Sequence, residues 1–134
     1  MDELIHYFFN AEVIREVGPY VLKGLLTTLG LSALVIPLGL LSGFALAIAG
    51  HYAKNRVLQF LLMAYTDLFR AFPPLVLLIF IFFGLPFLGM KLNEFTAAVL
   101  ALTLNGSSYF AEIFRAGIES VPRGQREAAR STGL

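Results

Sequence analysis

The sequence predicts an all-α membrane protein with three transmembrane helices and a short cytoplasmic helix. Of its 134 residues, 57% are hydrophobic, 13 are Phe and only 14% are charged, and the mean hydropathy is +0.76. Soluble domains rarely have such a composition. The net charge of +1 and the lack of a Lys/Arg run exclude the basic surface of a nucleic-acid-binding protein. With no Cys, disulfides and thiolate metal sites are excluded as well.

The first predicted span covers residues 24–49, which contain no ionisable residue. These 26 positions exceed the roughly 20 that a helix needs to cross a hydrocarbon core. Gly39 and Gly43 have the spacing that lets two helix backbones approach closely, and Pro37 should kink the helix. The residues before the span carry acidic groups where a signal peptide has a basic region, so we expect no cleaved leader.

The second predicted span, residues 57–83, is interrupted. Asp67 and Arg70 lie three residues apart, on one helical face. Pro73 and Pro74 follow and remove two backbone donors, so we expect the helix to kink or break there and to resume through LVLLIFIFF. A local Asp67–Arg70 pair near the inner interface is favoured over a role in transport, although ionisable groups inside a span are commonly functional.

A turn-rich stretch, GLPFLGMKLNE, leads to the third predicted span, residues 95–116. Its middle contains the polar run NGSS at positions 105–108. Short polar groups at mid-membrane can line a wet path or serve close helix packing, and both alternatives stay open. Together with the charged residues of spans two and three, they give the candidates for a translocation path: Asn105, Ser107, Ser108, Glu112, Asp67 and Arg70.

The basic residues outside the spans, together with Arg115 at the end of the third, are divided unevenly between the two sides of the membrane. One side carries six, namely Lys54, Arg56, Arg115, Arg123, Arg126 and Arg130, and the other carries three, namely Arg15, Lys23 and Lys91. Because cytoplasmic loops carry the excess of Lys and Arg, this count predicts an external N-terminus and a cytoplasmic C-terminus.

After the third span, the sequence predicts a short charged helix over residues 124–132. Gly133 suits the left-handed conformation just past a helix end. Ala128 and Ala129 are small enough for the backbone of a partner to approach, and Glu127 near the N-terminal end would match the helix macrodipole. An exposed charged helix can also be a solvated cap that binds nothing.

The run EAA at positions 127–129, followed by three residues and Gly133, has the spacing of the E-A-A-x-x-x-G loop of bacterial ABC importer permeases. The longer stretch YFAEIFRAGIESVPRGQREAARSTGL resembles the polar amino acid subfamily of those permeases. GLLTTLGLSALVIPLGLLSG and DLFRAFPPLVLLIFIFFGLP are similar to its first and second spans. The resemblance implies that a docking helix couples this chain to an ATPase through Gln125, Glu127, Ala128, Ala129 and Gly133.

The same resemblance implies the transmembrane subunit of an ATP-binding-cassette importer for polar amino acids, in the bacterial cytoplasmic (inner) membrane. Its implied partners are cytosolic ABC ATPase subunits, a second permease subunit, identical or paralogous, an extracytoplasmic amino-acid-binding protein and the bilayer. The sequence has no phosphate-binding loop, nucleophile elbow or HExxH pair. We therefore expect a transport subunit that is not an enzyme and has no cofactor or metal, with ATP hydrolysis in a partner.

Permeases of this subfamily usually continue past the glycine through further transmembrane helices, whereas this chain ends one residue after Gly133. We therefore expect residues 1–134 to be a single transmembrane permease domain truncated at its C-terminus. The alternatives are a small helical membrane channel or scaffold protein, and a non-functional truncated permease.

Overall fold

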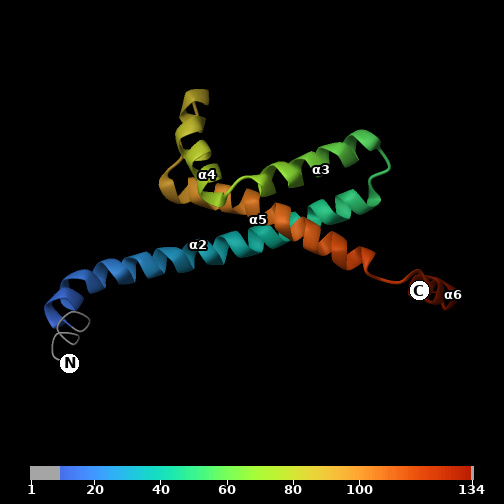
Figure 1. Ribbon diagram of the computed structural model, residues 1–134, viewed down its shortest axis with the longest axis horizontal. Helices are drawn as coiled ribbons and strands as arrows, with labels where there is room; N and C mark the ends of the chain where they lie inside the picture. Colours follow the sequence, from blue (N-terminus) through green and yellow to red (C-terminus); the bar gives the residue numbers. More distant parts are fainter. Residues whose placement is uncertain (1–9, 134) are drawn as a thin grey trace. The chain divides into compact units, whose positions relative to one another are not determined.

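The computed structural model describes residues 10–133, and the regular elements in that range are helical (Figure 1). They are α2 (Ala11–Tyr52), α3 (Arg56–Ala71), α4 (Pro74–Ile79), the π-helix η1 (Phe80–Gly84), the 3-10 helix η2 (Leu85–Leu88), α5 (Glu94–Glu119) and α6 (Arg123–Ser131). The chain divides into two compact units, Met1–Ala33 and Leu34–Leu134, and α2 contributes residues to both.

Helix α2 contains the predicted first span and begins 13 residues before it, at Ala11. Asn10 caps this start, because its side-chain oxygen accepts a hydrogen bond from the backbone N–H of Glu12 at 3.0 Å. The helix continues through Pro37 without interruption. The apolar run indicates only the part of α2 that can cross a membrane. The charged residues before that run belong to the same helix. The first nine residues, on which the expectation about a leader partly rests, lie outside the described range.

The break predicted at the two prolines is confirmed. Helix α3 runs from Arg56 to Ala71. Asn55 caps its start, because the Asn55 side chain accepts a hydrogen bond from the N–H of Val57 at 2.8 Å. The helical arm from Pro74 to Leu88 leaves it at an angle of 102°. This turn is sharper than a kink within one straight span, and the arm passes from α-helix to π-helix to 3-10 helix rather than resuming as one α-helix.

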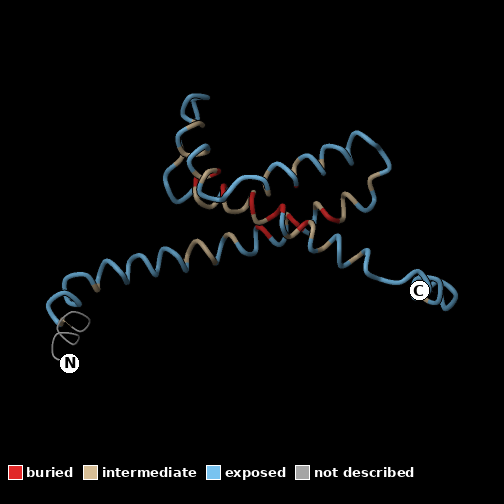
Figure 2. The backbone as a smooth tube through the Cα atoms, in the orientation of Figure 1, coloured by how far each residue is buried: buried red, intermediate tan, exposed pale blue. Residues whose placement is uncertain are grey.

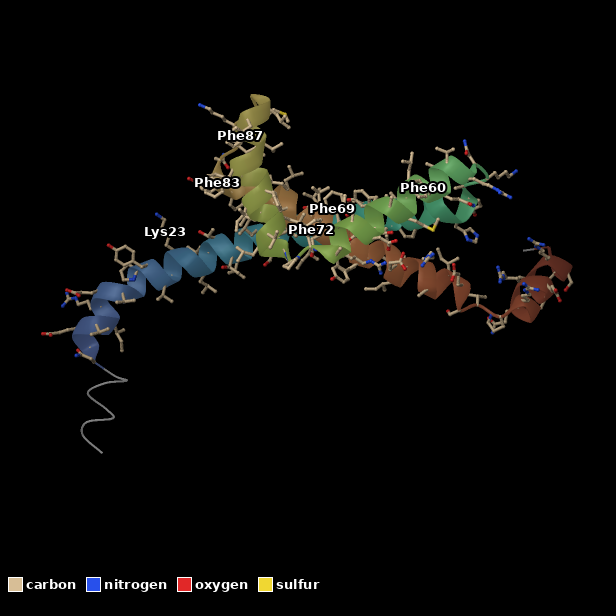
Figure 3. The ribbon with its side chains drawn as sticks, turned by 45° about the horizontal axis from the view of Figure 1, so that its top comes forward. Lys23, Phe60, Phe69, Phe72, Phe83 and Phe87 are labelled. Atoms are coloured by element: carbon tan, nitrogen blue, oxygen red, sulfur yellow. The ribbon has the colours of Figure 1, made fainter. Side chains whose placement is uncertain are left out.

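Helix α5 is central to the second unit and packs against both α3 and α4. Its buried apolar residues are small: Ala97 and Ala101 are 0% exposed and Ala111 is 4% exposed. Figure 2 shows the buried stretches gathered along α5 and the adjoining part of α2. Large side chains lie outside instead, such as Phe83 and Phe87, which project from the arm in Figure 3. Lipid is as apolar as a protein core, so close packing of small residues is what holds membrane helices together.

The predicted all-α membrane fold is confirmed, and the described residues contain two candidate spans, or three if a bent helix pair is counted as one. Helices α2 and α5 are each long and apolar enough to cross a membrane, and the bent pair Arg56–Ala71 and Pro74–Leu88 is a third span if it is counted as one. The predicted third span, residues 95–116, lies within α5.

Candidate functional site

Gly43 of α2 packs directly against the backbone of α5. A Cβ atom at this position would lie 2.6 Å from the Cβ of Phe110 and 2.9 Å from the carbonyl oxygen of Ser107. At Gly39, one turn earlier, a Cβ would lie 3.3 Å from the Phe110 ring. The small-residue spacing seen in the sequence therefore marks a close helix crossing, and α5 is the partner.

Asn105 and Tyr109 of α5 occupy the backbone acceptors that the proline break leaves open in α3. The carbonyls of Phe69 and Arg70 would normally accept from residues 73 and 74, which are prolines without an N–H. The side-chain amide of Asn105 donates to the carbonyl of Phe69 at 2.8 Å, and the Tyr109 hydroxyl donates to that of Arg70 at 3.5 Å. Asn105 thus has a structural role at the bend, consistent with its 7% exposure.

Ser107 and Ser108 lie inside the helix packing. The Ser107 hydroxyl is 2.7 Å from the hydroxyl of Tyr65 on α3, and Ser108 donates to the carbonyl of Asn105 at 2.6 Å. The two serines are 1% and 0% exposed. This geometry supports the packing alternative for the NGSS run, and a role in the translocation path stays a prediction. The sequence had not indicated Tyr65, because a tyrosine in an apolar helix carries no local signal of a partner 42 residues away.

Three of the charged candidates come together across α3 and α5. The Arg70 guanidinium lies 2.8 Å from the Asp67 carboxylate and 3.8 Å from that of Glu112, and Glu112 also pairs with Arg115 at 2.7 Å. The favoured local Asp67–Arg70 pair is confirmed, and Arg70 in addition reaches across to α5. Their side chains are 25–71% exposed, so each pair contributes about 1 kcal/mol or less to stability.

A groove of about 220 Å³ opens beside these charges, between α3, α5 and the C-terminal end of α2. Glu112, Arg115 and Glu119 line it from α5, and His51 and Gln59 line it from α2 and α3. Carboxylate, guanidinium and imidazole groups beside apolar residues can receive a polar solute. Within residues 10–133, no group of three or more His, Cys, Asp or Glu side chains is placed to hold a metal ion.

Four of the five coupling candidates lie on α6, a separate helix of nine residues, and the fifth, Gly133, follows it. Its bounds, Arg123–Ser131, differ by one residue at each end from the predicted 124–132. Beyond its end, Gly133 has a φ of +83°, so the predicted left-handed glycine is confirmed. Gln125, Glu127 and Ala128 are exposed and Ala129 is half-buried, so these side chains are accessible to a partner.

The expectation that Glu127 benefits from the helix macrodipole is wrong. Glu127 is the fifth of nine residues in α6, and the first turn contains no acidic residue. The macrodipole effect falls off within the first turn, so it stabilises Glu127 little. A carboxylate in mid-helix on an exposed surface is available to a partner instead.

The chain matches the family of "Binding-protein-dependent transport system inner membrane component" over residues 35–134. It is 38% identical over 128 residues to the probable amino-acid ABC transporter permease protein YckA of Bacillus subtilis (strain 168), which covers 96% of this chain and 56% of the relative. It is 40% identical over 116 residues to the putative glutamine transport system permease protein GlnP of Rickettsia prowazekii (strain Madrid E), covering 86% and 53%.

The arginine transport system permease protein ArtQ of Bacillus subtilis (strain 168) is 38% identical over 117 residues, covering 87% of this chain and 53% of the relative. A solved structure described as "Crystal structure of an amino acid ABC transporter with histidines" superposes with a TM-score of 0.81 at 39% identity. That match covers 90% of this chain and 56% of the other. The chain therefore spans about half the length of the relatives that it matches.

Proposed function

The chain belongs to the family of inner membrane components of binding-protein-dependent transport systems, and on that premise we propose that it forms part of the transmembrane subunit of an ABC importer for polar amino acids. The observation that carries the proposal is the EAA run with its glycine, which folds as the separate short helix α6 ending at a left-handed Gly133. Relatives named as glutamine and arginine transport permeases support the substrate class. Transport is a property of whole permeases, about half of whose length this chain spans.

The proposed assembly contains a second permease subunit, identical or paralogous, cytosolic ATPase subunits and an external amino-acid-binding protein. ATP-driven closure of the ATPases moves the docked α6, and only the three residues Ser120–Pro122 separate α6 from α5. Because α5 packs on α3 and α4, a displacement of α6 reaches the membrane helices and opens the path alternately to each side. In this mechanism, the ATPases hydrolyse ATP and the chain performs no covalent chemistry.

For the translocation path, we propose that the charged residues Asp67, Arg70 and Glu112 act at its cytoplasmic end. These three side chains are partly exposed, and Glu112 lines the polar groove. Asn105, Ser107 and Ser108 remain candidates deeper in the membrane, and a path role for them requires the helices to move apart, because they are buried in the present packing.

The test of the proposed function is reconstitution of the full-length permease with its ATPase and binding protein in proteoliposomes. We expect ATP hydrolysis to rise on addition of the binding protein with glutamine or arginine, together with uptake of the labelled amino acid. Passive flux of the amino acid without the ATPase would indicate a channel. The absence of both coupled uptake and ATPase association would contradict the importer proposal.

The proposed orientation places the N-terminus outside and the C-terminus in the cytoplasm, as the count of basic residues favours. A reporter fused after Ala53 should then be active as a cytoplasmic fusion, and one fused near Lys91 as an external fusion. Alkaline phosphatase and green fluorescent protein fusions at both positions measure this, and the opposite pattern would reverse the topology.

A further inference from the structure

Helix α6 has two faces of different chemistry. With about 100° between successive residues of an α-helix, all its charged residues fall on one side and its small or uncharged residues on the other. The charged face comprises Arg123, Arg126, Glu127 and Arg130, and the uncharged face comprises Gly124, Gln125, Ala128 and Ala129. Glu127 lies at the edge of the charged face, next to the uncharged one. Three cations and one anion give this face a net charge of +2.

The arginines of the charged face are available to an external partner. Arg123, Arg126 and Arg130 are exposed, and Figure 3 shows side chains around α6 that end in nitrogen and oxygen atoms. In the described part of the chain, the ion pairs within 4.0 Å join residues of α3 and α5 only. Within residues 10–133, no ion pair therefore neutralises the arginines of α6.

The position of α6 along the chain keeps it near the membrane surface. The charged residues Glu112, Arg115 and Glu119 lie in the C-terminal part of α5, as expected where a helix leaves the hydrocarbon core. Three residues follow before α6 begins, so four Cα–Cα steps of at most about 3.6 Å each hold its start within roughly 14 Å of the end of α5. That distance is comparable to the Debye length of about 10 Å at 0.1 M salt, so anionic headgroups attract the arginines.

We propose that α6 binds anionic phospholipid headgroups of the cytoplasmic leaflet through Arg123, Arg126 and Arg130, while its uncharged face contacts the ATPase. The proposal rests on the proposed function, which places α6 at the cytoplasmic side. Long, flexible arginine side chains reach headgroup phosphates and pair with them. Gly124, Ala128 and Ala129 instead leave room for a protein backbone on the opposite side. The helix is thus held between bilayer and ATPase.

The test uses a fluorescent label on α6. This chain has no Cys, so Ser131→Cys introduces one labelling position beside the charged face, with any Cys elsewhere in the full-length protein replaced. The full-length complex with its ATPase is placed in nanodiscs with or without phosphatidylglycerol, and energy transfer to headgroup-labelled lipid is measured.

Energy transfer should rise with phosphatidylglycerol and fall at high salt. Each Arg→Gln change should weaken the association of α6 with anionic discs about fivefold. Glu127→Gln should strengthen it, because it removes the one negative charge of the face. The double variant Arg15→Gln/Lys23→Gln, which removes two cations predicted on the external side, is the matched control and should keep the full lipid response.

Three results would overturn the proposal. The first is equal energy transfer with and without phosphatidylglycerol, and the second is an unchanged lipid response in Arg123→Gln/Arg126→Gln/Arg130→Gln. The third is loss of ATPase pull-down by this triple variant in lipid-free detergent, which would place the arginines on the ATPase. Failure of the proposed importer function gives a different result from these three. In that case α6 keeps its lipid response, but the ATPase does not bind the unmodified protein.

Discussion

Gly43→Ala is expected to lower the stability and the membrane abundance of the protein strongly, whereas Gly30→Ala in the same helix should not. The added methyl at position 43 would lie 2.6 Å from the Cβ of Phe110 and 3.0 Å from the backbone N of Ala111. These atoms belong to α5 itself and cannot move aside as a flexible side-chain tip can. Overpacking commonly costs about 1–3 kcal/mol, and we expect the upper end here.

Gly30 and Gly39 complete a graded series for this experiment. A Cβ at Gly30 would meet no described atom within 4 Å, so Gly30→Ala should be neutral or slightly stabilising, by up to about 1 kcal/mol from helix propensity. Gly39→Ala should lie between the two, because it meets only the edge of the Phe110 ring at 3.3 Å. The thermal stability of the detergent-solubilised variants and a blot of their abundance in the membrane measure this order of stability. Equal stability of Gly30→Ala and Gly43→Ala would show that this helix crossing does not hold α2 to α5.

The same crossing shows what the sequence could and could not predict about the fold. The Gly39/Gly43 spacing depends only on residues of one helix, and it correctly indicated a close approach. The identity of the partner depends on residues more than 60 positions away, at Ser107 and Phe110, and no local pattern carries that information. Likewise, two adjacent prolines predict a break, but they do not predict the 102° turn.

For the candidate site, features that depend on residues close together in the sequence were predictable, whereas contacts between different helices were not. The spacing of Asp67 and Arg70 predicted their pair, and Gly133 predicted the end of α6. The role of Asn105 at the bend escaped notice, because an amide in an apolar span fits a wet path as well as a backbone carbonyl left without its donor. Only the position of Phe69 opposite Asn105 distinguishes the two. Glu127 was misplaced relative to the macrodipole, because a helix start one residue earlier than predicted moves it from the fourth to the fifth position, beyond the first turn.

Glu127→Lys and Ala128→Trp are expected to abolish association with the ATPase for different physical reasons. In the proposed assembly, the Glu127 carboxylate pairs with a donor of the ATPase groove. Replacing it with Lys puts a cation against that donor, and losing a buried charged contact costs about 2–5 kcal/mol. The same change raises the net charge of the charged face from +2 to +4, so α6 should lose the ATPase while keeping or strengthening its response to anionic lipid.

Ala128→Trp acts through volume alone. Ala128 lies on the uncharged face of α6, and a Trp there holds the helix away from the groove while it changes the stability of the helix itself by less than about 1 kcal/mol. Arg126→Trp is the matched control, since it adds an indole on the opposite face and should keep ATPase binding in detergent. Both docking variants of the full-length protein should insert at parental abundance yet lose ATPase pull-down and amino acid uptake. If the ATPase binds both variants as it binds the parent, then α6 is a solvated cap and coupling must occur elsewhere, because neither a reversed charge nor a large side chain is tolerated in a buried helix interface.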